Sequence, residues 1–471
     1  MQGGGGLGRG RDPRGRSVIV PVLWIAAALA SDVLLVHGHV WDGSGAPAAS
    51  ADVWVHDDRV QAVGAGLGVP PGATILDASG ATVLPGLIDA HVHLSMDPGA
   101  GWRHDDDATH AAQVRAHLAA YLACGVTTVL DPAVLPAEEA RIRALLADGA
   151  PGPRYLSLGA PFSPPGGYVA AVIPGFPTVS NRAEVEAQLD GLLRDGDVGA
   201  KVTVERGFLV NRYPLHSPEV FGAIRAGATA RNLPIYAHAI SPEEQSIALD
   251  WLHPRAMVHA MERPDVRLVR QLRAAGTYTI TTLAIADAFA AATDLGRLAD
   301  PFLDARVPAS ELITARDPEV ARGFSEALLQ EMLPGLARWV AGPGFMRAAL
   351  RSHVAEANAA IRALRAGGVP LVLGSDAGNW PLIPYLFHGP STLRELELLH
   401  TAGLTPAEAL TAGTRTAAEM LELPLGRITV GSPADLVVVE GDPLSDLRAM
   451  RAVRWTVRAG EARTPAGWMG G

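Results

Sequence analysis

The stretch VLPGLIDAHVHL, residues 83–94, joins a run of short strands to a much longer segment in which strands and helices alternate. Side chains on a strand alternate between its two faces, so His91 and His93 point one way and Val92 points the other. Two imidazoles at this spacing can bind one metal ion, although structural histidines also occur in this pattern. The stretch therefore predicts a buried strand that ends in a candidate metal site.

The residues before this stretch resemble those at the far end of the chain. Short strand-like runs bounded by Gly, Pro or Asp follow Asp32, and the same texture returns in GRITVGSPADLVVVEGDPL, residues 426–444. Such runs are typical of small antiparallel sheets. We expect residues 31–86 and 426–471 to pair into one β-sandwich that flanks the rest of the molecule.

The middle of the chain, residues 87–425, alternates short Val/Ile/Leu runs with Ala-rich amphipathic stretches. The strand-like runs include residues 126–130, 200–204, 234–238, 256–260, 277–283 and 369–376. This alternation over such a length predicts an α/β fold, a (β/α)8 TIM-like barrel. Residues 284–357 carry no strand signal. We expect them to form either a helical lid or a dimer contact, and a dimer contact would make the protein a homo-oligomer.

The composition of the chain excludes several classes of protein. The chain has 471 residues, 48% hydrophobic and 19% charged, with a net charge of -10 and a single cysteine. Disorder is excluded by the apolar content, and a disulfide framework is excluded because Cys124 has no partner. The acidic balance argues against a nucleic-acid partner, so we expect a small-molecule substrate. Cys124 itself is expected to be a small buried hydrophobe.

The first residues have a composition of their own. Residues 1–16 are rich in Gly and Arg, and the apolar run Val18–Ala30 ends in Ala28-Leu29-Ala30. A basic start, a short apolar run and an A-x-A ending are typical of a secretory signal peptide. We expect residues 1–30 to be a leader and the mature protein to be secreted or periplasmic if it is cleaved, and cytoplasmic otherwise. A retained membrane anchor and an extra buried helix are the alternatives.

Four other polar side chains stand at or next to the ends of apolar runs in the middle segment. They are Lys201, His238, His259 and Asp376. Burial of such groups costs free energy unless they have partners. Because the carboxyl ends of barrel strands meet at one mouth, we expect these side chains to converge with His91 and His93.

These motifs together resemble the amidohydrolase superfamily, and within it the imidazolonepropionase-like group of dipeptidases, prolidase-like enzymes and ochratoxin-cleaving amidases. The resemblance is carried by VLPGLIDAHVHL, by GVTTVLD at 125–131, by the strand-end Lys201, His238 and His259, by LVLGSDAG at 371–378, and by the C-terminal tail. It implies a barrel with a flanking β-sandwich. Imidazolonepropionase itself lacks the lysine, so Lys201 argues against that exact activity.

The resemblance also implies a centre of two divalent metal ions. His91, His93 and Asp376 would bind the more buried ion, and His238 and His259 would bind the second. Lys201 stands where relatives carry a lysine N-carboxylated by carbon dioxide, which bridges both ions; a free ammonium has no lone pair for a metal. The alternative is an unmodified Lys201 paired with an acid. Zinc is the favoured metal, although these ligands also suit Mn, Fe and Co.

The implied reaction is hydrolysis of a carbon–nitrogen bond by a metal-bridging hydroxide, with Asp376 as general base. A dipeptide or an N-acyl amino acid is the expected substrate. Hydrolysis of a cyclic amide, deamination, or cleavage of a lactone or ester at the same site is the alternative within enzymes. A metal-free binding scaffold is the alternative of another class, but it predicts that ligands should be missing, and all six positions are filled.

Three further residues are candidates for contact with substrate. Tyr168, after the third barrel strand, could donate a hydrogen bond to the carbonyl or the oxyanion, or cover the pocket wall. Arg206 could bind a substrate carboxylate, although a solvated surface arginine is the simpler interpretation. His388 follows the last strand and could contact substrate. The run Asp105–Asp107 is expected to be solvated.

Overall fold

The computed structural model describes residues 32–95, 107–173, 175–207, 212–332, 343–379 and 383–470. It also describes the backbone of two short strands, β1 (Arg9–Arg11) and β2 (Ser17–Ile19), which pair with each other. Most of the predicted leader at 1–30, and Asp105 and Asp106 of the acidic run, lie outside the described residues. Among the described residues, no helix has both the length and the apolar character needed to cross a membrane.

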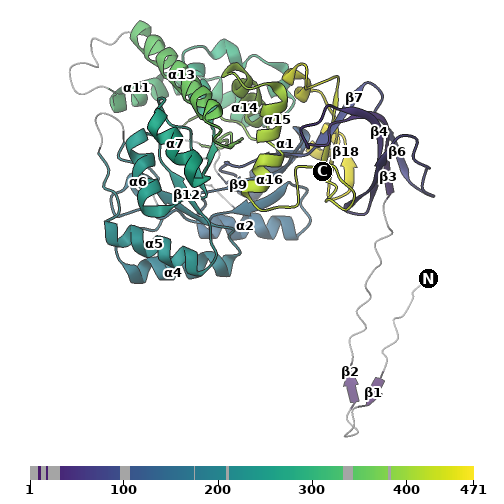
Figure 1. The fold of residues 1–471 in the computed structure, drawn as a ribbon, viewed down its shortest axis with the longest axis horizontal. Coiled ribbons are helices and arrows are strands. Elements are labelled where there is room, and N and C mark those ends of the chain that lie inside the picture. Colours follow the sequence, from purple (N-terminus) through teal and green to yellow (C-terminus); the bar gives the residue numbers. More distant parts are fainter. Residues whose placement is uncertain are drawn as a thin grey trace.

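Strands from both ends of the chain share one mixed sheet of eight strands (Figure 1). Its order is β18-β17-β16-β7-β3-β4-β5, with β6 paired to β3. The central contact is antiparallel and joins the two ends, with Leu436 opposite Pro85. The strands are β3 (Asp32–Val40), β4 (Ala49–His56), β5 (Arg59–Gly64), β6 (Thr74–Asp77), β7 (Ala81–Pro85), β16 (Leu436–Glu440), β17 (Val453–Arg458) and β18 (Glu461–Arg463).

Strand β16 lies between two hydrophobic cores, which explains its uninterrupted apolar sequence. Leu436 and Val438 pack into the core of the mixed sheet, whereas Val437 and Val439 belong to the larger core of the middle segment. The mixed sheet and the middle segment approach each other closely at Gly125. This residue has a φ of 76°, and a Cβ there would lie 2.5 Å from Val437 Cγ2. A side chain at position 125 would therefore separate the sheet from the middle segment.

The middle segment contains eight parallel strands in two sheets. One has the order β10-β9-β8 and the other β11-β12-β13-β14-β15. Isolated parallel bridges connect the two sheets at both junctions, Val92 with Ala377 and Phe162 with Val202. The strands are β8 (Leu87–Asp89), β9 (Val126–Asp131), β10 (Arg154–Ser157), β11 (Ala200–Thr203), β12 (Ile235–His238), β13 (Ala256–Val258), β14 (Tyr278–Ile280) and β15 (Leu371–Val372).

Helices connect these strands and cover their outer side. Several begin at a side chain that caps the free backbone N–H groups, as Ser241 and Glu244 do in the capping box of α6. The helices outside the segment between β14 and β15 are α1 (Asp107–Ala123), α2 (Pro136–Ala147), α3 (Tyr168–Val172), α4 (Arg182–Asp195), α5 (Pro218–Ala230), α6 (Pro242–Leu252), α7 (Val266–Ala275), α14 (Pro390–Thr401), α15 (Pro406–Ala412), α16 (Arg415–Met420), η2 (Leu447–Arg451) and α17 (Pro465–Met469).

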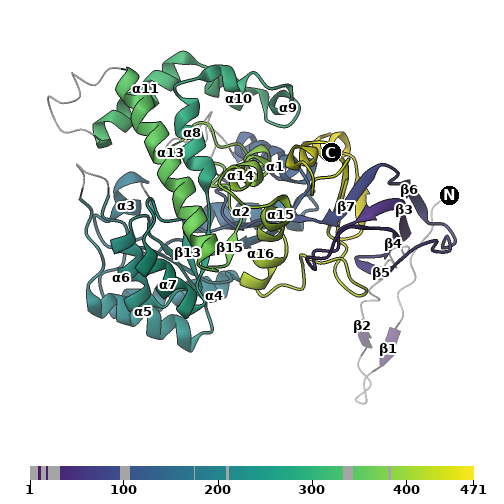
Figure 2. The same cartoon turned by 45° about the horizontal axis from the view of Figure 1, so that its top comes forward.

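The segment between β14 and β15 is helical where it is described. Its elements are α8 (Leu283–Ala291), η1 (Leu295–Leu298), α9 (Pro301–Asp304), α10 (Ala309–Ala315), α11 (Pro318–Met332) and α13 (Pro343–Ala366). Figure 2 shows α9, α10 and α11 on the side of the molecule opposite α4 and α5. Buried Glu311 of α10 lies 2.6 Å from His117 Nε2 on α1, so a polar contact connects this segment to α1.

The expected strand at 277–283 is shorter in the structure. It ends at Ile280, and α8 already begins at Leu283. The reason is long-range: the Glu395 carboxylate of α14 accepts hydrogen bonds from the backbone N–H groups of Leu283 and Ala284, at 3.0 and 2.7 Å. These are N–H groups that a new helix leaves without partners, so Glu395 fixes where α8 starts.

Candidate metal centre

Three predicted ligands from the first and last parallel strands come together in the structure. His91 Nε2 and His93 Nε2 lie 3.0 and 2.9 Å from Asp376 Oδ1. The ligand atoms of all three residues lie within 4.8 Å of one another, and all three side chains are buried. Two imidazoles and a carboxylate arranged in this way are a donor set that suits a divalent transition metal.

The charges in this cluster favour an ionised Asp376. Burial acts to raise the pKa of Asp376, but His91 and His93 outweigh it and hold that pKa well below its ordinary value. Burial lowers the pKa of His91 to about 3, so that His91 is neutral at physiological pH. Burial acts to lower the pKa of His93 as well, but Asp376 outweighs it and raises that pKa. A metal ion requires an ionised carboxylate and neutral imidazoles of its ligands, so a bound ion would displace the proton that Asp376 favours on His93.

His238 and His259 form a second pair next to the first. His259 Nε2 lies 3.0 Å from His238 Nδ1, and the rings of His259 and His91 are 4.9 Å apart between centroids. Burial, followed by the charge of His238, holds the pKa of His259 well below its ordinary value. Thr282 Oγ1 lies 2.8 Å from His259 Nδ1 and orients the ring from behind. The pair therefore presents two adjacent imidazole rings that could bind a second ion.

Backbone strain is concentrated at this site. His259, Thr282 and Asp376 have φ values of 76°, 50° and 57°, in the left-handed region that side chains other than glycine rarely adopt. Each follows the end of a strand and carries a polar group to the centre. Such conformations persist only where the surrounding structure enforces them, and they are often associated with functional sites.

Lys201 is the only lysine among the 39 Lys and Arg residues of the chain. Its side chain is buried on β11, and burial lowers its pKa to about 7 against the opposing charges of Asp376 and Asp131. Among the described residues, no carboxylate forms a salt bridge with Lys201. The predicted alternative, an unmodified Lys201 paired with an acid, therefore has no partner in the described part of the chain.

Of the three residues predicted to contact substrate, one lines the cavity at the centre and two do not. Tyr168 stacks on His238, with ring centroids 5.4 Å apart, and lines the cavity beside the histidines. His388 is buried against His117, with ring centroids 3.9 Å apart, and its Nδ1 lies 3.0 Å from Tyr121 Oη. Arg206 is exposed. Neither His388 nor Arg206 is among the described residues that line this cavity.

Two residues with a clear place at the centre were not singled out in the sequence. Asn379 donates a hydrogen bond to Asp376 Oδ2 at 2.8 Å and lines the same cavity. Buried Asp89, on β8, accepts hydrogen bonds from Ser375 Oγ and Thr392 Oγ1, each at 2.6 Å, and thereby ties the first strand to the loop that carries Asp376. The sequence did contain an indication of Asp89, because an acidic residue interrupts the apolar run LIDA, residues 87–90. The contact of Asn379 had no local signal.

The cavity at the centre has a volume of about 140 Å³. Its lining includes three candidate metal ligands, His238, His259 and Asp376, together with Tyr168, and the rest is mainly apolar. The larger apolar side chains in the lining are Ile240, Met261, Leu283, Ile285, Phe289 and Ile383. Such a combination of a few polar groups and an apolar wall is typical of a small-molecule site.

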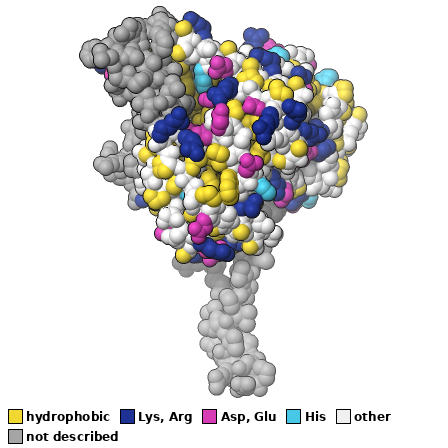
Figure 3. Space-filling model, turned by 60° about the vertical axis from the view of Figure 1, so that its left-hand side comes forward, with side chains coloured by type: hydrophobic (Ala, Val, Ile, Leu, Met, Phe, Trp, Pro, Cys, Tyr) yellow, Lys and Arg dark blue, Asp and Glu magenta, His cyan; other side chains and the backbone are white. Residues whose placement is uncertain are grey.

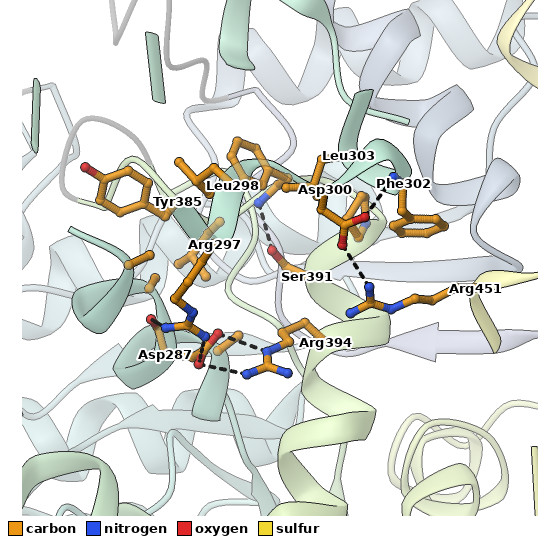
Figure 4. A pocket seen from close by; sticks show the side chains of 16 residues that line it. Asp287, Arg297, Leu298, Asp300, Phe302, Leu303, Tyr385, Ser391, Arg394 and Arg451 are labelled. Carbon is orange, nitrogen blue, oxygen red and sulfur yellow. Dashed lines mark hydrogen bonds and ion pairs between the residues drawn. The ribbon is translucent and has the colours of Figure 1, made fainter. Parts of the chain in front are cut away.

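A second cavity of about 240 Å³ lies between α8, η1, α9 and α14 (Figure 4). Its charged groups neutralise one another. Asp287 accepts from Arg394 and Arg297, while Arg451 binds Asp300 and Glu397. Among the described residues, no cluster of metal ligands is found there. The charged side chains that line this cavity instead form an ion-pair network between helices. Figure 3 likewise shows acidic and basic side chains interspersed over the coloured part of one face.

Comparison with known proteins agrees with this geometry. A family model described as the amidohydrolase family matches residues 82–462. The structure is similar to that of a Xaa-Pro dipeptidase with bound methionine in the active site, with a TM-score of 0.71 and 20% identity, covering 92% of this chain and 100% of that one. It is also similar to A. niger ochratoxinase, with a TM-score of 0.70 and 20% identity over 93% and 98% of the two chains.

Curated relatives match shorter segments. A dihydroorotase of Citrifermentans bemidjiense is 45% identical over 74 residues, 16% of this chain and 17% of that protein. An N-acyl-D-glutamate deacylase of Alcaligenes xylosoxydans xylosoxydans is 34% identical over 121 residues, 25% of this chain and 22% of that protein. These matches thus span about a fifth of each relative's length.

The family model covers most of the chain, and the chain belongs to the amidohydrolase family. The solved structures show a TIM-barrel-like α/β fold, which confirms the predicted fold class at this level.

Proposed function

We propose that this protein is a metal-dependent hydrolase that cleaves a carbon–nitrogen bond of a small amide, a dipeptide or an N-acyl amino acid. One observation carries the proposal: strand ends far apart in sequence bring two clusters of candidate ligands, His91 with His93 and Asp376, and His238 with His259, next to each other, and His238, His259 and Asp376 line one cavity. Structural histidines do not need such an arrangement, and membership of the amidohydrolase family supports the same interpretation.

The donor groups fit two divalent ions, with zinc as the favoured metal. His91, His93 and Asp376 would hold one ion, and His238 and His259 the other. Bound ions would lower the pKa of a water molecule and polarise the substrate carbonyl. We also propose that the eight parallel strands close into one (β/α)8 barrel beside a β-sandwich, since bridges at Val92 and Phe162 connect the edges of both sheets.

We propose that Lys201 is N-carboxylated and supplies oxygen ligands between the two pairs. Lys201, the single lysine of the chain, is buried on β11, and its charge acts on the pKa values of His91 and His93. Desolvation favours the neutral amine, which is the form that reacts with carbon dioxide. The neutral amine forms an N–C bond with carbon dioxide and releases one proton, which leaves a carbamate anion that a metal centre would stabilise.

Asp376 would move the proton during hydrolysis. Asn379 holds Oδ2 of Asp376 at 2.8 Å, which fixes the plane of the carboxylate. Asp376 would accept a proton from the attacking water and deliver it to the departing nitrogen, as a general base and then a general acid. Tyr168 would donate a hydrogen bond to the substrate carbonyl, which its stacking on His238 at the cavity wall supports.

The cavity wall supports a substrate with an apolar group. Leu283, Ile285 and Phe289 of α8 line the same cavity as His238, His259 and Asp376. The names of the similar proteins point to the same substrate classes, an Xaa-Pro dipeptidase for dipeptides and an N-acyl-D-glutamate deacylase for N-acyl amino acids. We therefore propose amides whose acyl or side-chain group is apolar.

The proposal is tested by metal analysis together with a substrate panel. We expect two equivalents of divalent metal per chain and hydrolysis that is lost with chelator and restored by Zn²⁺. The panel should contain dipeptides and N-acyl amino acids with apolar and charged groups, as well as cyclic amides, amine-bearing rings and lactones. A purified protein that binds no divalent ion would contradict the proposal, and preference for a lactone would replace amide hydrolysis by the alternative reaction.

A further inference from the structure

Glu205 is a buried carboxylate beside the candidate metal centre. It follows β11 by two residues, and its side chain is only 4% exposed. One oxygen, Oε1, accepts a hydrogen bond from Gly207 N at 2.6 Å. The other, Oε2, is buried without a hydrogen-bond partner and lies 3.6 Å from His238 Nε2. An unsatisfied carboxylate oxygen in this position is costly unless it serves a partner at the site.

His238 has the complementary geometry. Its Nδ1 faces His259 Nε2 at 3.0 Å, on the side of the candidate metal, whereas its Nε2 is buried without a hydrogen-bond partner on the side of Glu205. An imidazole that binds a metal through Nδ1 must carry its remaining proton on Nε2. That proton requires an acceptor, and Glu205 Oε2 is the carboxylate oxygen facing it.

We propose that Glu205 is a positioning residue that accepts the Nε2–H of His238 and thereby holds His238 in the tautomer that binds the second metal ion through Nδ1. The inference rests on the proposed function, because it requires the second ion. Carboxylates behind ligating histidines fix the ring and increase its basicity. The backbone supports the arrangement, since Val204 N donates to His238 O at 2.8 Å and keeps the two segments in register.

The variant Glu205→Gln tests this role because glutamine has a single acceptor oxygen. The carboxylate of Glu205 faces two N–H donors, Gly207 N and the proposed His238 Nε2–H. If the amide oxygen stays with Gly207, the amide NH2 faces His238 Nε2 and donates to it. That contact favours the tautomer with the proton on Nδ1, which cannot bind a metal there. Glu205→Gln therefore removes a negative charge and favours the wrong tautomer of His238, and both changes weaken binding of the second ion.

Glu244 provides a matched control. It is as buried as Glu205, and among the described residues its two oxygens accept from backbone N–H groups alone, those of Arg206 at 2.7 Å and Ser241 at 3.0 Å. Glu244→Gln should lower stability by removing one acceptor, but it leaves His238 untouched. Glu205→Asp keeps two acceptor oxygens on a shorter side chain and should restore part of what Glu205→Gln loses.

The experiment is a titration of the metal-free proteins with Zn²⁺ in competition with a chromophoric chelator. We expect one of two zinc equivalents to bind about 10- to 100-fold more weakly in Glu205→Gln, with the other unchanged, Glu244→Gln like the wild type, and Glu205→Asp in between. Thermal unfolding without metal shows whether each variant folds. Two wild-type affinities in Glu205→Gln, or an equal loss in Glu244→Gln, would overturn the inference. A wild type that binds no zinc would instead overturn the proposed function.

Discussion

At the scale of single residues, Asp376 is expected to serve both as a ligand and as a proton carrier. One oxygen faces His91 and His93, and the other is held by Asn379. Asp376→Asn keeps the shape of the side chain and one oxygen donor but cannot accept a proton at neutral pH. We expect metal content to fall modestly and kcat to fall by about 10² to 10⁴, measured by elemental analysis and steady-state kinetics. An unchanged kcat would refute the proton role.

Lys201 allows an unusually clean test, because the chain has no other lysine. With ¹³C-labelled bicarbonate, we expect a single side-chain carbamate signal in ¹³C NMR, which only Lys201 can produce. Lys201→Ala should abolish the signal and lower metal content, since the centre loses the oxygen ligands that join the two pairs. Arg206→Ala, an exposed neighbour, should leave both unchanged. Two full metal equivalents in Lys201→Ala would argue against a bridging carbamate.

Most residues of the candidate centre could be found from local sequence, whereas their supports could not. His91 and His93 are paired by the period of a strand, and Lys201, His238, His259 and Asp376 stand out because each interrupts or follows an apolar run. Glu205 also follows an apolar run, at 200–204, but its role and that of Asn379 depend on side-chain contacts that a sequence does not contain. Arg206 is exposed and His388 is buried behind the site, because sequence position on a loop does not specify side-chain direction.

At the scale of elements, the start of α8 depends on Glu395, which lies more than a hundred residues further along the chain. Its carboxylate accepts from Thr281 Oγ1 as well as from Leu283 N and Ala284 N. Glu395→Gln leaves one of these donors unpaired, and we expect a loss of about 1–3 kcal/mol in stability. Hydrogen exchange at residues 283–284 should accelerate, as measured by mass spectrometry.

A capping residue away from the site separates this effect from a general loss of stability. Glu408 caps α15 through Thr405. Glu408→Gln should lower stability without faster exchange at residues 283–284. Unchanged exchange at residues 283–284 in Glu395→Gln would show that Glu395 does not determine the start of the helix. The boundary could not be read from the sequence, because TYTITTL is a good strand sequence and only a distant carboxylate ends the strand early.

At the scale of the whole molecule, one chain of ion pairs connects regions that are far apart in sequence. Asp287 of α8 binds Arg394 of α14, Arg394 binds Glu397, and Glu397 binds Arg451 near the C-terminal strands. Arg451 then returns to Asp300, in the segment between β14 and β15. The network therefore connects that segment both to α14 and to η2 near the C-terminal end. The composition predicted a helical segment at this place but not these partners.

Asp287 makes this fastening dependent on pH. Burial acts to raise the pKa of Asp287, but Arg394 and Arg297 outweigh it, and the pKa in the folded protein lies below its ordinary value of 3.8. The stabilisation is therefore complete above the unfolded-state pKa and is lost as pH falls through the lower folded-state value. Asp287→Asn should cost about 1–3 kcal/mol at pH 7, with a gap to the wild type that narrows below about pH 4. Urea unfolding midpoints over a pH series measure this gap.

Glu461→Gln, which breaks an exposed pair with Arg463, should show no comparable gap at any pH. If the gap between Asp287→Asn and the wild type were constant down to pH 2, the ionised carboxylate would not be what fastens the segment, and packing around α8 would have to account for it.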